Sequence, residues 1–387
     1  MDINRRIKTL VGSSTLAITA RAKELRAQGK DVVSFAGGEP DFDTPPEIKQ
    51  AAIQAIQDGF TKYTPSVGAL ELRQIISKKF ARENNLTYNP QQVAVCCGAK
   101  HALFNVIQVL ADDGDEVLIP SPYWVSYPEM VKVAGATPRF IPTTAKSCFK
   151  INAGMLEKHI TKQTKILILN SPSNPTGMVY SLEELRPIAE LCVKNRIWII
   201  SDEIYEKLIY ESSSFASVAS LGPEVFARTI TVNGVSKSFS MTGWRIGYCA
   251  GPQEIMDYVK NFQDHSTSNP CSISQKAALQ ALMSSEESIL AMRQEFKQRR
   301  DLLMSLMDKI PGITYIKPEG AFYLFCDFSS LGDSQDVARR ILNDVNVALI
   351  PGDGFGAPGF MRLSFSTSKE RIQEGVKRLA DWIAKNR

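Results

Sequence analysis

Short apolar runs rich in β-branched residues alternate along the chain with stretches whose apolar residues recur at helical spacing. The helical stretches lie at His101–Ala111, Ser181–Lys194 and Glu254–Phe262. Because the short runs are apolar throughout, they predict strands buried on both faces, as in an α/β fold with a mostly parallel sheet sandwiched by helices. The runs are Val93–Cys97, Glu116–Ile119, Lys165–Leu169, Ile197–Ile200, Thr229–Val232 and Ile246–Ala250.

The pattern changes at about Ser272. A long helical pattern runs from Ser274 to about Ile310, with an expected break near Ser284–Ser285. Strands and helices in the order that follows predict a separate, smaller α+β domain. The expected elements are strand Gly320–Asp327, helix Ser334–Asn343, strands Val347–Ile350 and Met361–Phe365, and helix Lys369–Asn386. An N-terminal helix around Ile18–Gln28 suits packing against either unit.

Composition excludes several classes of protein. The 387 residues carry 45 Lys+Arg against 41 Asp+Glu, a net charge of +4 without the dense basic stripe of a nucleic-acid binder. Seven Cys without a C-x-x-C pair indicate a reducing, cytoplasmic compartment, and the three His lack metal-ligand spacing. No apolar run approaches the length that spans a membrane. We therefore expect a cytoplasmic protein that needs no metal, membrane or nucleic acid.

Candidate chemistry follows the predicted strands. Ligands of open parallel sheets bind at the carboxyl ends of the strands. Five of the expected strands are followed there by polar or aromatic segments, which would meet at one edge of the sheet. These segments are Gly98–His101, Pro120–Trp124, Asn170–Gly177, Ser201–Tyr205 and Asn233–Lys237.

One group of these residues suits a phosphate. Gly98 and Ala99 open a predicted helix, whose free backbone N–H groups and positive dipole end favour an anion. Arg245 and Ser236 would add a charge and a hydroxyl.

A second group suits an aromatic aldehyde. Trp124 offers a flat face, Asp202 at a buried strand end needs a cation such as a protonated ring nitrogen, and Lys237 supplies an amine for an imine. Pyridoxal phosphate combines all of these features.

Six segments in order resemble motifs of the class I/II pyridoxal-phosphate-dependent aminotransferases. The likeness spans nearly the whole chain and is closest to the bacterial aspartate aminotransferases, some of which also act on prephenate. It implies a fold-type I enzyme with a seven-stranded, mostly parallel sheet. It also implies a large domain over residues 45–285 and a small domain, formed by residues 1–44 and 286–387, that closes over the substrate. The segments are Gly37–Phe42, Tyr63–Gly68, Ser171–Gly177, Ser201–Tyr205, Ser236–Tyr248 and Met361–Phe365.

The resemblance also implies catalytic and cofactor-binding roles. Lys237 would bind the cofactor and move the substrate proton, Asp202 would keep the ring nitrogen protonated, and Tyr205 would hydrogen-bond the phenolic oxygen together with Asn174. Tyr63 would reach the phosphate bound by a partner subunit, so the active unit would be a homodimer. The full implied cofactor set is Gly98, Ala99, Lys100, Trp124, Asn174, Asp202, Tyr205, Ser236, Lys237, Arg245 and Tyr63.

A dicarboxylate substrate needs two cationic groups, and the same resemblance supplies them. Arg362 would bind the α-carboxylate and Lys100 the distal one. Aspartate or glutamate with a keto acid such as 2-oxoglutarate are the expected substrates, in a ping-pong cycle. The implied substrate set is Ser13, Thr15, Gly38, Lys100, Trp124, Asn174 and Arg362.

Each assignment has a structural alternative. Asp202 suits a helix cap, Trp124 the core, and Lys100 a surface ion pair. Ser13 with Thr15 suits a helix N-cap, and Tyr63 a turn with Pro65 and Gly68.

His101 heads an amphipathic helix and is expected to be structural. The segment Gly352–Ala357 fits G-x-G-x-x-A, but Pro358 and Gly359 follow it, so it predicts a turn rather than a dinucleotide loop.

The residues are also compatible with other functions. Prephenate, aromatic amino acids or alanine are alternative substrates, and β-elimination from cysteine S-conjugates is an alternative reaction on the same framework. A cofactor-sensing regulator is disfavoured because few residues precede Phe35, too few for a DNA-binding domain.

Overall fold

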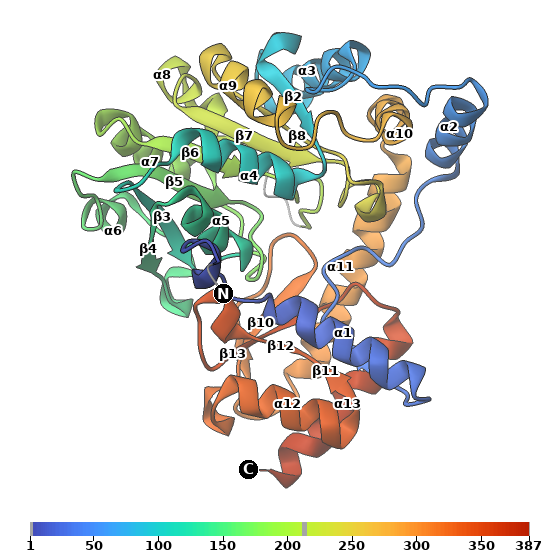
Figure 1. The fold of residues 1–387 in the computed structure, drawn as a ribbon. Coiled ribbons are helices and arrows are strands. Elements are labelled where there is room, and N and C mark those ends of the chain that lie inside the picture. The colour runs from blue at the N-terminus through green and yellow to red at the C-terminus, as the bar shows by residue number, and fades with distance from the viewer. Residues whose placement is uncertain (1–2, 211–214, 387) are drawn as a thin grey trace.

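The computed structural model describes residues 3–210 and 215–386. Its larger sheet has seven strands in the order β2-β8-β7-β6-β5-β3-β4 (Figure 1). Neighbouring strands are parallel except at β8, which runs antiparallel to β2 and β7. The five strands whose carboxyl ends carry the candidate chemistry therefore run in one direction. The strands are β2 (Val93–Cys96), β3 (Glu116–Ser121), β4 (Thr137–Pro142), β5 (Thr164–Asn170), β6 (Trp198–Asp202), β7 (Thr229–Gly234) and β8 (Gly247–Ala250).

Helices cover both faces of this sheet, as predicted (Figure 1). Ile166 and Ile168 of β5 pack in the same apolar cluster as α4, α5 and α9, whereas Leu167 and Leu169 pack with α7 on the other face. This alternation explains why the strand sequences are apolar throughout. The helices are α2 (Pro46–Gln57), α3 (Leu70–Asn84), α4 (Ala99–Leu110), α5 (Ser126–Ala134), α6 (Ala153–Glu157), α7 (Leu182–Lys194), α8 (Pro223–Phe226), α9 (Gln253–Asp264) and α10 (Ser272–Met283).

Strand β4 had no counterpart among the runs that we identified in the sequence. It lies at the edge of the sheet, where it pairs only with β3, and most of its residues are partly or fully exposed. It also contains Pro138 and Pro142, which edge strands tolerate because one side of the strand needs no ladder hydrogen bonds. Exposure and proline together remove the apolar pattern that marks the other strands.

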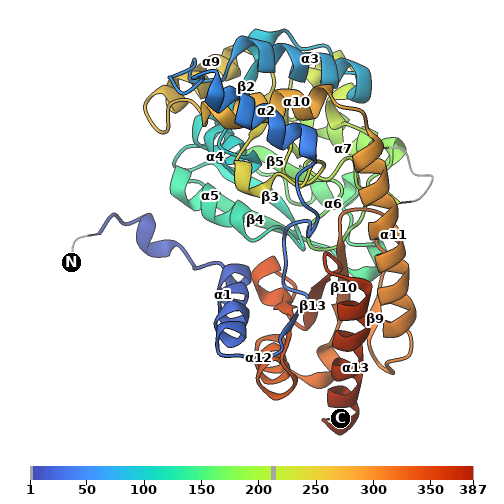
Figure 2. The ribbon, with the colours of Figure 1, turned by 90° about the vertical axis from the view of Figure 1, so that its right-hand side faces the viewer.

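The smaller unit has a four-stranded antiparallel sheet in the order β12-β13-β10-β9 and a short parallel pair, β1 with β11. Helix α11 runs from the larger unit down the side of the smaller one (Figures 1 and 2). The expected break in the long helix is confirmed, because α10 ends at Met283 and α11 begins at Glu287. The elements are α1 (Ser14–Ala27), β1 (Val33–Ser34), α11 (Glu287–Met307), β9 (Thr314–Tyr315), β10 (Tyr323–Asp327), α12 (Ser334–Val345), β11 (Val347–Ala348), β12 (Ile350–Pro351), β13 (Phe360–Ser364) and α13 (Lys369–Lys385).

The N-terminal segment contacts both units. Ala22 and Leu25 of α1 pack in an apolar cluster with Ile350 of the smaller unit. Ahead of α1, Arg6 forms an ion pair of 2.7 Å with Asp113 of the larger unit. The proposed domain boundaries at residues 45 and 285 remain a prediction.

Two further outcomes concern possible ligands. Residues 352–355 form a 3-10 turn that leads into β13, so the G-x-G-x-x-A match is not a dinucleotide loop. Within the described residues, no helix combines the length and apolar character needed to cross a bilayer.

Candidate active site

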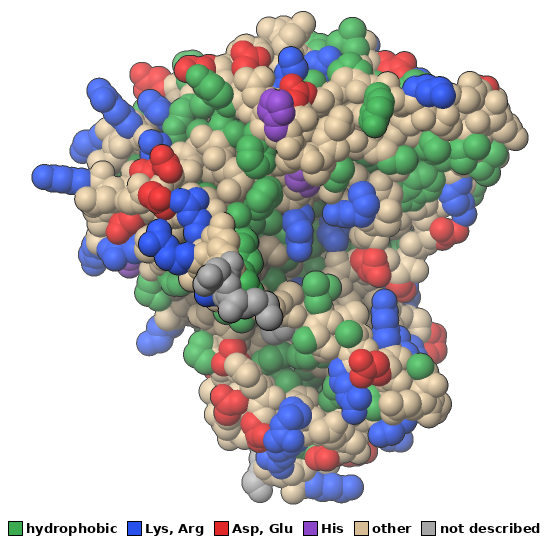
Figure 3. All heavy atoms as spheres, viewed as in Figure 1, with side chains coloured by type: hydrophobic (Ala, Val, Ile, Leu, Met, Phe, Trp, Pro, Cys, Tyr) green, Lys and Arg blue, Asp and Glu red, His purple; other side chains and the backbone are tan. Residues whose placement is uncertain are grey.

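A cavity of ≈ 220 Å³ lies where the carboxyl ends of the large sheet face the smaller unit. Lys and Arg side chains are visible in the hollow between the two units (Figure 3). All the predicted site residues line this cavity except Gly98 and Tyr63. The lining members are Ser13, Thr15, Gly38, Ala99, Lys100, Trp124, Asn174, Asp202, Tyr205, Ser236, Lys237, Arg245 and Arg362.

Two glycines bring Arg245 to the start of α4. Gly98 is the N-cap with φ 89°, and a Cβ there would lie 2.4 Å from Nη2 of Arg245. A Cβ on Gly247 of β8 would lie 2.1 Å from the backbone nitrogen of Ala99. The free N–H groups of the helix start, the guanidinium and the nearby Ser236 hydroxyl therefore form one anion-binding corner. Gly98 lies behind this corner rather than on the cavity wall.

Asp202 ends β6 as a buried carboxylate. Its Oδ2 accepts a hydrogen bond of 2.6 Å from the Tyr127 hydroxyl, and Oδ1 accepts one of 3.3 Å from the backbone of Ile204. Burial raises the pKa of Asp202 to about 6, against the opposing hydrogen bonds and the charge of Lys237. A buried carboxylate facing a cavity is stabilised by a cation, and a protonated ring nitrogen is a suitable one. No helix begins at Asp202, so the helix-cap alternative is excluded.

Lys237 follows β7 and points its amine across the cavity to the smaller unit. The Nζ atom donates a hydrogen bond of 2.5 Å to the backbone oxygen of Gly38. Burial, together with the charges of Arg362 and Arg245, lowers the pKa of Lys237 to about 8, and the charges of Glu39 and Asp202 oppose this shift. An amine with this pKa is partly neutral near pH 7–8, which imine formation requires.

Arg362 of β13 is 2% exposed and lies at the opposite side of the cavity. Its Nη1 donates to Oδ1 of Asn174 at 2.9 Å, and Nη2 donates to the oxygen of Ala36 at 3.1 Å. Its Nε is buried with no partner among the described residues. Burial lowers the pKa of this guanidinium. A buried cation with spare donors is suited to a carboxylate.

Lys100 and Trp124 form a third part of the wall. The Lys100 ammonium lies 4.9 Å from the centroid of the Trp124 ring, and the ring packs edge-on to Tyr127. Burial lowers the pKa of Lys100, and the charge of Arg245 lowers it further. Lys100 lines the cavity and forms no ion pair within the described residues, unlike the surface-pair alternative.

The two predicted N-terminal hydroxyls differ. Ser13 caps α1, since its side chain accepts a hydrogen bond of 3.3 Å from the backbone of Leu16. Thr15 does not act as a cap, and its Oγ1 is buried with no partner within the described residues. Ser13 thus matches the helix-cap alternative, although it also lines the cavity.

Tyr63 lies outside the cavity, with 91% of its surface exposed. The turn after it is formed by Gly68, whose backbone nitrogen donates to the oxygen of Pro65. His101 is structural as expected, because its Nδ1 accepts a hydrogen bond of 3.2 Å from the backbone of Cys97.

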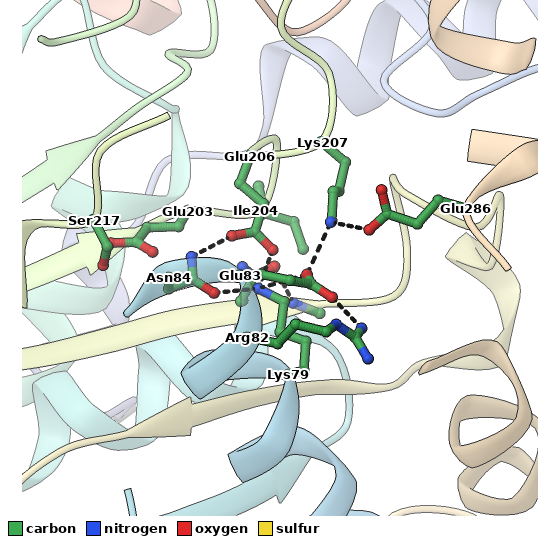
Figure 4. Close-up of polar contacts among 12 residues, drawn as sticks. Lys79, Arg82, Glu83, Asn84, Glu203, Ile204, Glu206, Lys207, Ser217 and Glu286 are labelled. Atoms are coloured by element: carbon green, nitrogen blue, oxygen red, sulfur yellow. Dashed lines mark hydrogen bonds and ion pairs between the residues drawn. The ribbon is translucent and has the colours of Figure 1, made fainter. Parts of the chain in front are cut away.

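The segment that carries Asp202 and Tyr205 is held from behind by buried polar groups (Figure 4). Glu203 accepts hydrogen bonds from Ser201 and Ser217 at 2.8 and 2.7 Å. Glu206 forms an ion pair with Lys79 of α3 and accepts a hydrogen bond of 2.6 Å from Asn84. Residues 202 and 205 therefore face the cavity, while residues 203 and 206 fix the backbone of the same segment.

The cavity residues to which the sequence analysis gave no role include Tyr127, Asn170 and Tyr323. Asn170 was visible as the first residue after a predicted strand, and its side chain holds the backbone of Asp202 and Asn174. Tyr127 follows the predicted strand-end segment that includes Trp124. Tyr323 lay in a predicted strand without any polar signal, so only the structure placed it here.

This donor set fits pyridoxal phosphate. The anion corner at Ala99 suits the phosphate, Asp202 the ring nitrogen, Trp124 the ring face and Lys237 the aldehyde. Tyr205 and Asn174 line the space between them.

Comparison with known proteins agrees with this geometry. The family model "Aminotransferase class I and II" matches residues 30–379. The aspartate aminotransferase of Geobacillus stearothermophilus is 49% identical over 98% of both chains, and the aspartate/prephenate aminotransferase of Nitrosomonas europaea is 44% identical over 99% of this chain and 100% of its own. The structure of Thermus thermophilus aspartate aminotransferase with maleate is similar at a TM-score of 0.95 and 42% identity, over 98% of this chain and 99% of that one. The chain therefore belongs to the class I and II aminotransferases, a family that uses pyridoxal phosphate.

Proposed function

We propose that this enzyme moves an amino group between aspartate or glutamate and a 2-keto acid such as 2-oxoglutarate, with pyridoxal phosphate bound at Lys237. The observation that carries this proposal is a single cavity lined by the Lys237 amine and, besides Arg245 at the anion-binding corner, by two further cations, Arg362 and Lys100. A dicarboxylate has one carboxylate for each of these cations. Maleate, the compound in the related Thermus thermophilus structure, is also a dicarboxylate.

Each residue around the cavity would have a separate role, set by its position. When bound, pyridoxal phosphate supplies an electron sink for the carbon that carries the substrate amino group. Asp202 would hold the proton on the ring nitrogen, and Arg245 with the start of α4 would hold the phosphate. Lys237, whose pKa is lowered to about 8, would accept the proton from the substrate Cα and deliver it to the C4′ carbon of the cofactor. Arg362 would orient the α-carboxylate.

Both halves of the reaction would use this one site. The amino acid would leave as a keto acid before the second keto acid enters, so the kinetics would be ping-pong. Prephenate is a second candidate acceptor, supported by relatives named aspartate/prephenate aminotransferase. Lys100 is a flexible point charge, which tolerates a distal carboxylate at more than one distance.

The first test is the absorption spectrum of the purified protein with pyridoxal phosphate, before and after aspartate is added without a keto acid. We expect a visible band that moves to shorter wavelength with aspartate. A band unchanged by aspartate would contradict the dicarboxylate assignment. Absence of the band, or full turnover by Lys237→Ala, would contradict the cofactor assignment.

A second assay separates amino transfer from β-elimination. Amino transfer requires a keto acid, whereas a lyase would release pyruvate from cystathionine without one. We expect no such keto-acid-independent pyruvate release.

A homodimer forms part of the same proposal. Tyr63 is 91% exposed, and Ile53, Ile56 and Leu70 are 46%, 55% and 50% exposed. Hydrophobic side chains gather over the surface formed by α2 (Figure 3). Burial of this surface against a second copy of the chain would bring Tyr63 to the anion-binding corner of that copy. Sedimentation at micromolar concentration should give twice the mass of one chain, and Ile53→Asp should reduce it to one.

The cytoplasm remains the proposed location. All seven Cys are free thiols, and four of them, Cys96, Cys192, Cys249 and Cys326, are buried. A reducing compartment maintains this state.

A further inference from the structure

A pair of buried phenols lies beside the cavity. The hydroxyl groups of Tyr205 and Tyr323 are 2.8 Å apart, and their rings meet edge to face with centroids 5.9 Å apart. Tyr205 belongs to the segment after β6, whereas Tyr323 begins β10 of the smaller unit. This hydrogen bond therefore joins the cofactor side of the cavity to the unit that carries Arg362.

Tyr323 also contacts the proposed carboxylate-binding cation. The guanidinium carbon of Arg362 lies 4.4 Å from the centroid of the Tyr323 ring. Burial raises the pKa of Tyr323, and the positive charge of Arg362 opposes this rise. Tyr323 is 0% exposed, so this charge acts on it with little screening by water.

The two phenols share one proton in their mutual hydrogen bond, and the other proton is left for a different acceptor. Arg362 lies over the Tyr323 ring and lowers the pKa of Tyr323 more than that of Tyr205, so Tyr323 is the stronger acid and the favoured donor to Tyr205. The proton of Tyr205 is then directed away from Tyr323. Since Tyr205 lines the cavity, the acceptor available to it is a ligand in that cavity.

We propose that Tyr323 is a positioning residue, whose hydroxyl donates to Tyr205 and so directs the Tyr205 proton to the phenolic oxygen of the cofactor. This inference rests on the proposed function, which places that oxygen beside Tyr205 and Asn174. A donor that itself accepts a hydrogen bond is polarised and donates more strongly. Tyr323 thereby stabilises the ionised form of the phenolic oxygen through Tyr205.

The test is a pH titration of the visible absorption band of the loaded protein. Tyr323→Phe keeps the ring over Arg362 and removes only the hydroxyl. It should raise the midpoint of the titration by about half to one pH unit, the effect of one ordinary hydrogen bond. In a Tyr205→Phe background the same change should leave the midpoint where Tyr205→Phe alone puts it, because the connecting hydroxyl is gone.

Tyr210→Phe is the matched control. Tyr210 is a buried phenol of the same apolar cluster, and its hydroxyl donates to the backbone oxygen of Ala321 rather than to a cavity residue. It does not line the cavity. Its loss should leave the titration midpoint unchanged.

The outcomes separate the two proposals. A wild-type protein without a visible band contradicts the proposed function itself. If the wild-type protein has the band and Tyr323→Phe leaves its titration midpoint unchanged, the inference about Tyr323 is wrong. It is also wrong if Tyr323→Phe shifts the midpoint equally in the wild-type and the Tyr205→Phe backgrounds. If Tyr323→Phe does not fold, 3,5-difluorotyrosine at position 323, a stronger donor of nearly the same shape, should lower the midpoint. An unchanged or raised midpoint there also overturns the inference.

Discussion

Glu203 provides a test of how buried polar groups stabilise the segment that carries Asp202 and Tyr205. It is 1% exposed, and its Oε1 accepts hydrogen bonds from Ser201 and Ser217. Its Oε2 is buried with no partner among the described residues (Figure 4). Burial, together with the charge of Glu206, raises the pKa of Glu203 from 4.5 to about 8 against the hydrogen bonds from Ser217 and Ser201, so this carboxyl is mainly protonated at neutral pH.

The raised pKa predicts the sign of a pH effect on stability. Below pH 4.5 the carboxyl is protonated in both the folded and the unfolded chain. Between 4.5 and about 8 the folded chain retains a proton that the unfolded chain releases, so the free energy of unfolding falls as the pH rises. The slope is about 1.4 kcal/mol per pH unit, and the whole interval amounts to about 5 kcal/mol.

Glu203→Gln removes this titration and keeps an oxygen that accepts from both serines. We expect the difference in unfolding free energy between wild type and variant to change by about 3 kcal/mol from about pH 5.5 to about pH 7.5. The variant should gain relative to wild type as the pH rises. Urea unfolding followed by circular dichroism, at equal protein and saturating cofactor concentrations, measures this difference.

The exposed Glu224 supplies the control, because Glu224→Gln removes a carboxyl at the surface. The pH profile of this variant measures what the loss of one surface carboxyl does to stability, and subtracting it isolates the effect of the buried Glu203. Parallel pH profiles for wild type and Glu203→Gln would refute the reasoning, since they would mean that Glu203 titrates alike in the folded and unfolded chains.

Three further predictions concern the cavity. Because the pKa of Lys237 is lowered to about 8, the rate at which the cofactor-free protein binds pyridoxal phosphate should rise about tenfold per pH unit below pH 8 and level off above it. Stopped-flow absorbance measures this rate, and a rate independent of pH would contradict the prediction. Gly98 has a φ of 89°, and Gly98→Ala places a Cβ 2.4 Å from Nη2 of Arg245, so the substitution should weaken cofactor binding at least about tenfold. Fluorescence titration measures the affinity, and an unchanged affinity would argue against the anion-binding corner. Arg362→Lys loses the paired donors that suit a carboxylate, so the KM for aspartate should rise about 10- to 100-fold in steady-state assays. An unchanged KM would mean that Arg362 does not bind the substrate.

Much of the fold was predictable because buried strands and amphipathic helices leave local patterns. Val93–Cys96 and Thr229–Gly234 form strands within two residues of the predicted runs. Strand β4 was missed because its exposed residues and prolines lack that pattern. The antiparallel direction of β8 also left no local signal, because the direction of a strand depends on the path of the chain around it.

Much of the candidate site was predictable for a related reason. Groups at the ends of parallel strands meet at one edge, and Asp202, Lys237 and Asn174 were placed correctly on that ground. The partners of these groups were not predictable. Tyr323 meets Tyr205 across 118 residues of sequence, and Tyr127 meets Asp202 across 75.

The sequence by itself determined the succession of strands and helices and the chemical groups available at the strand ends, because periodicity and residue type are local properties of the chain. Only the tertiary structure decided which of those groups hydrogen-bond to one another, which form the anion-binding corner and which contact a buried charged side chain. Ser13 as a helix cap, Tyr63 outside the cavity and Tyr323 between Arg362 and Tyr205 all follow from how distant segments pack. Hydrogen bonds and pKa shifts depend on distances of a few ångströms, and those distances are set by packing between elements rather than by neighbours in the sequence.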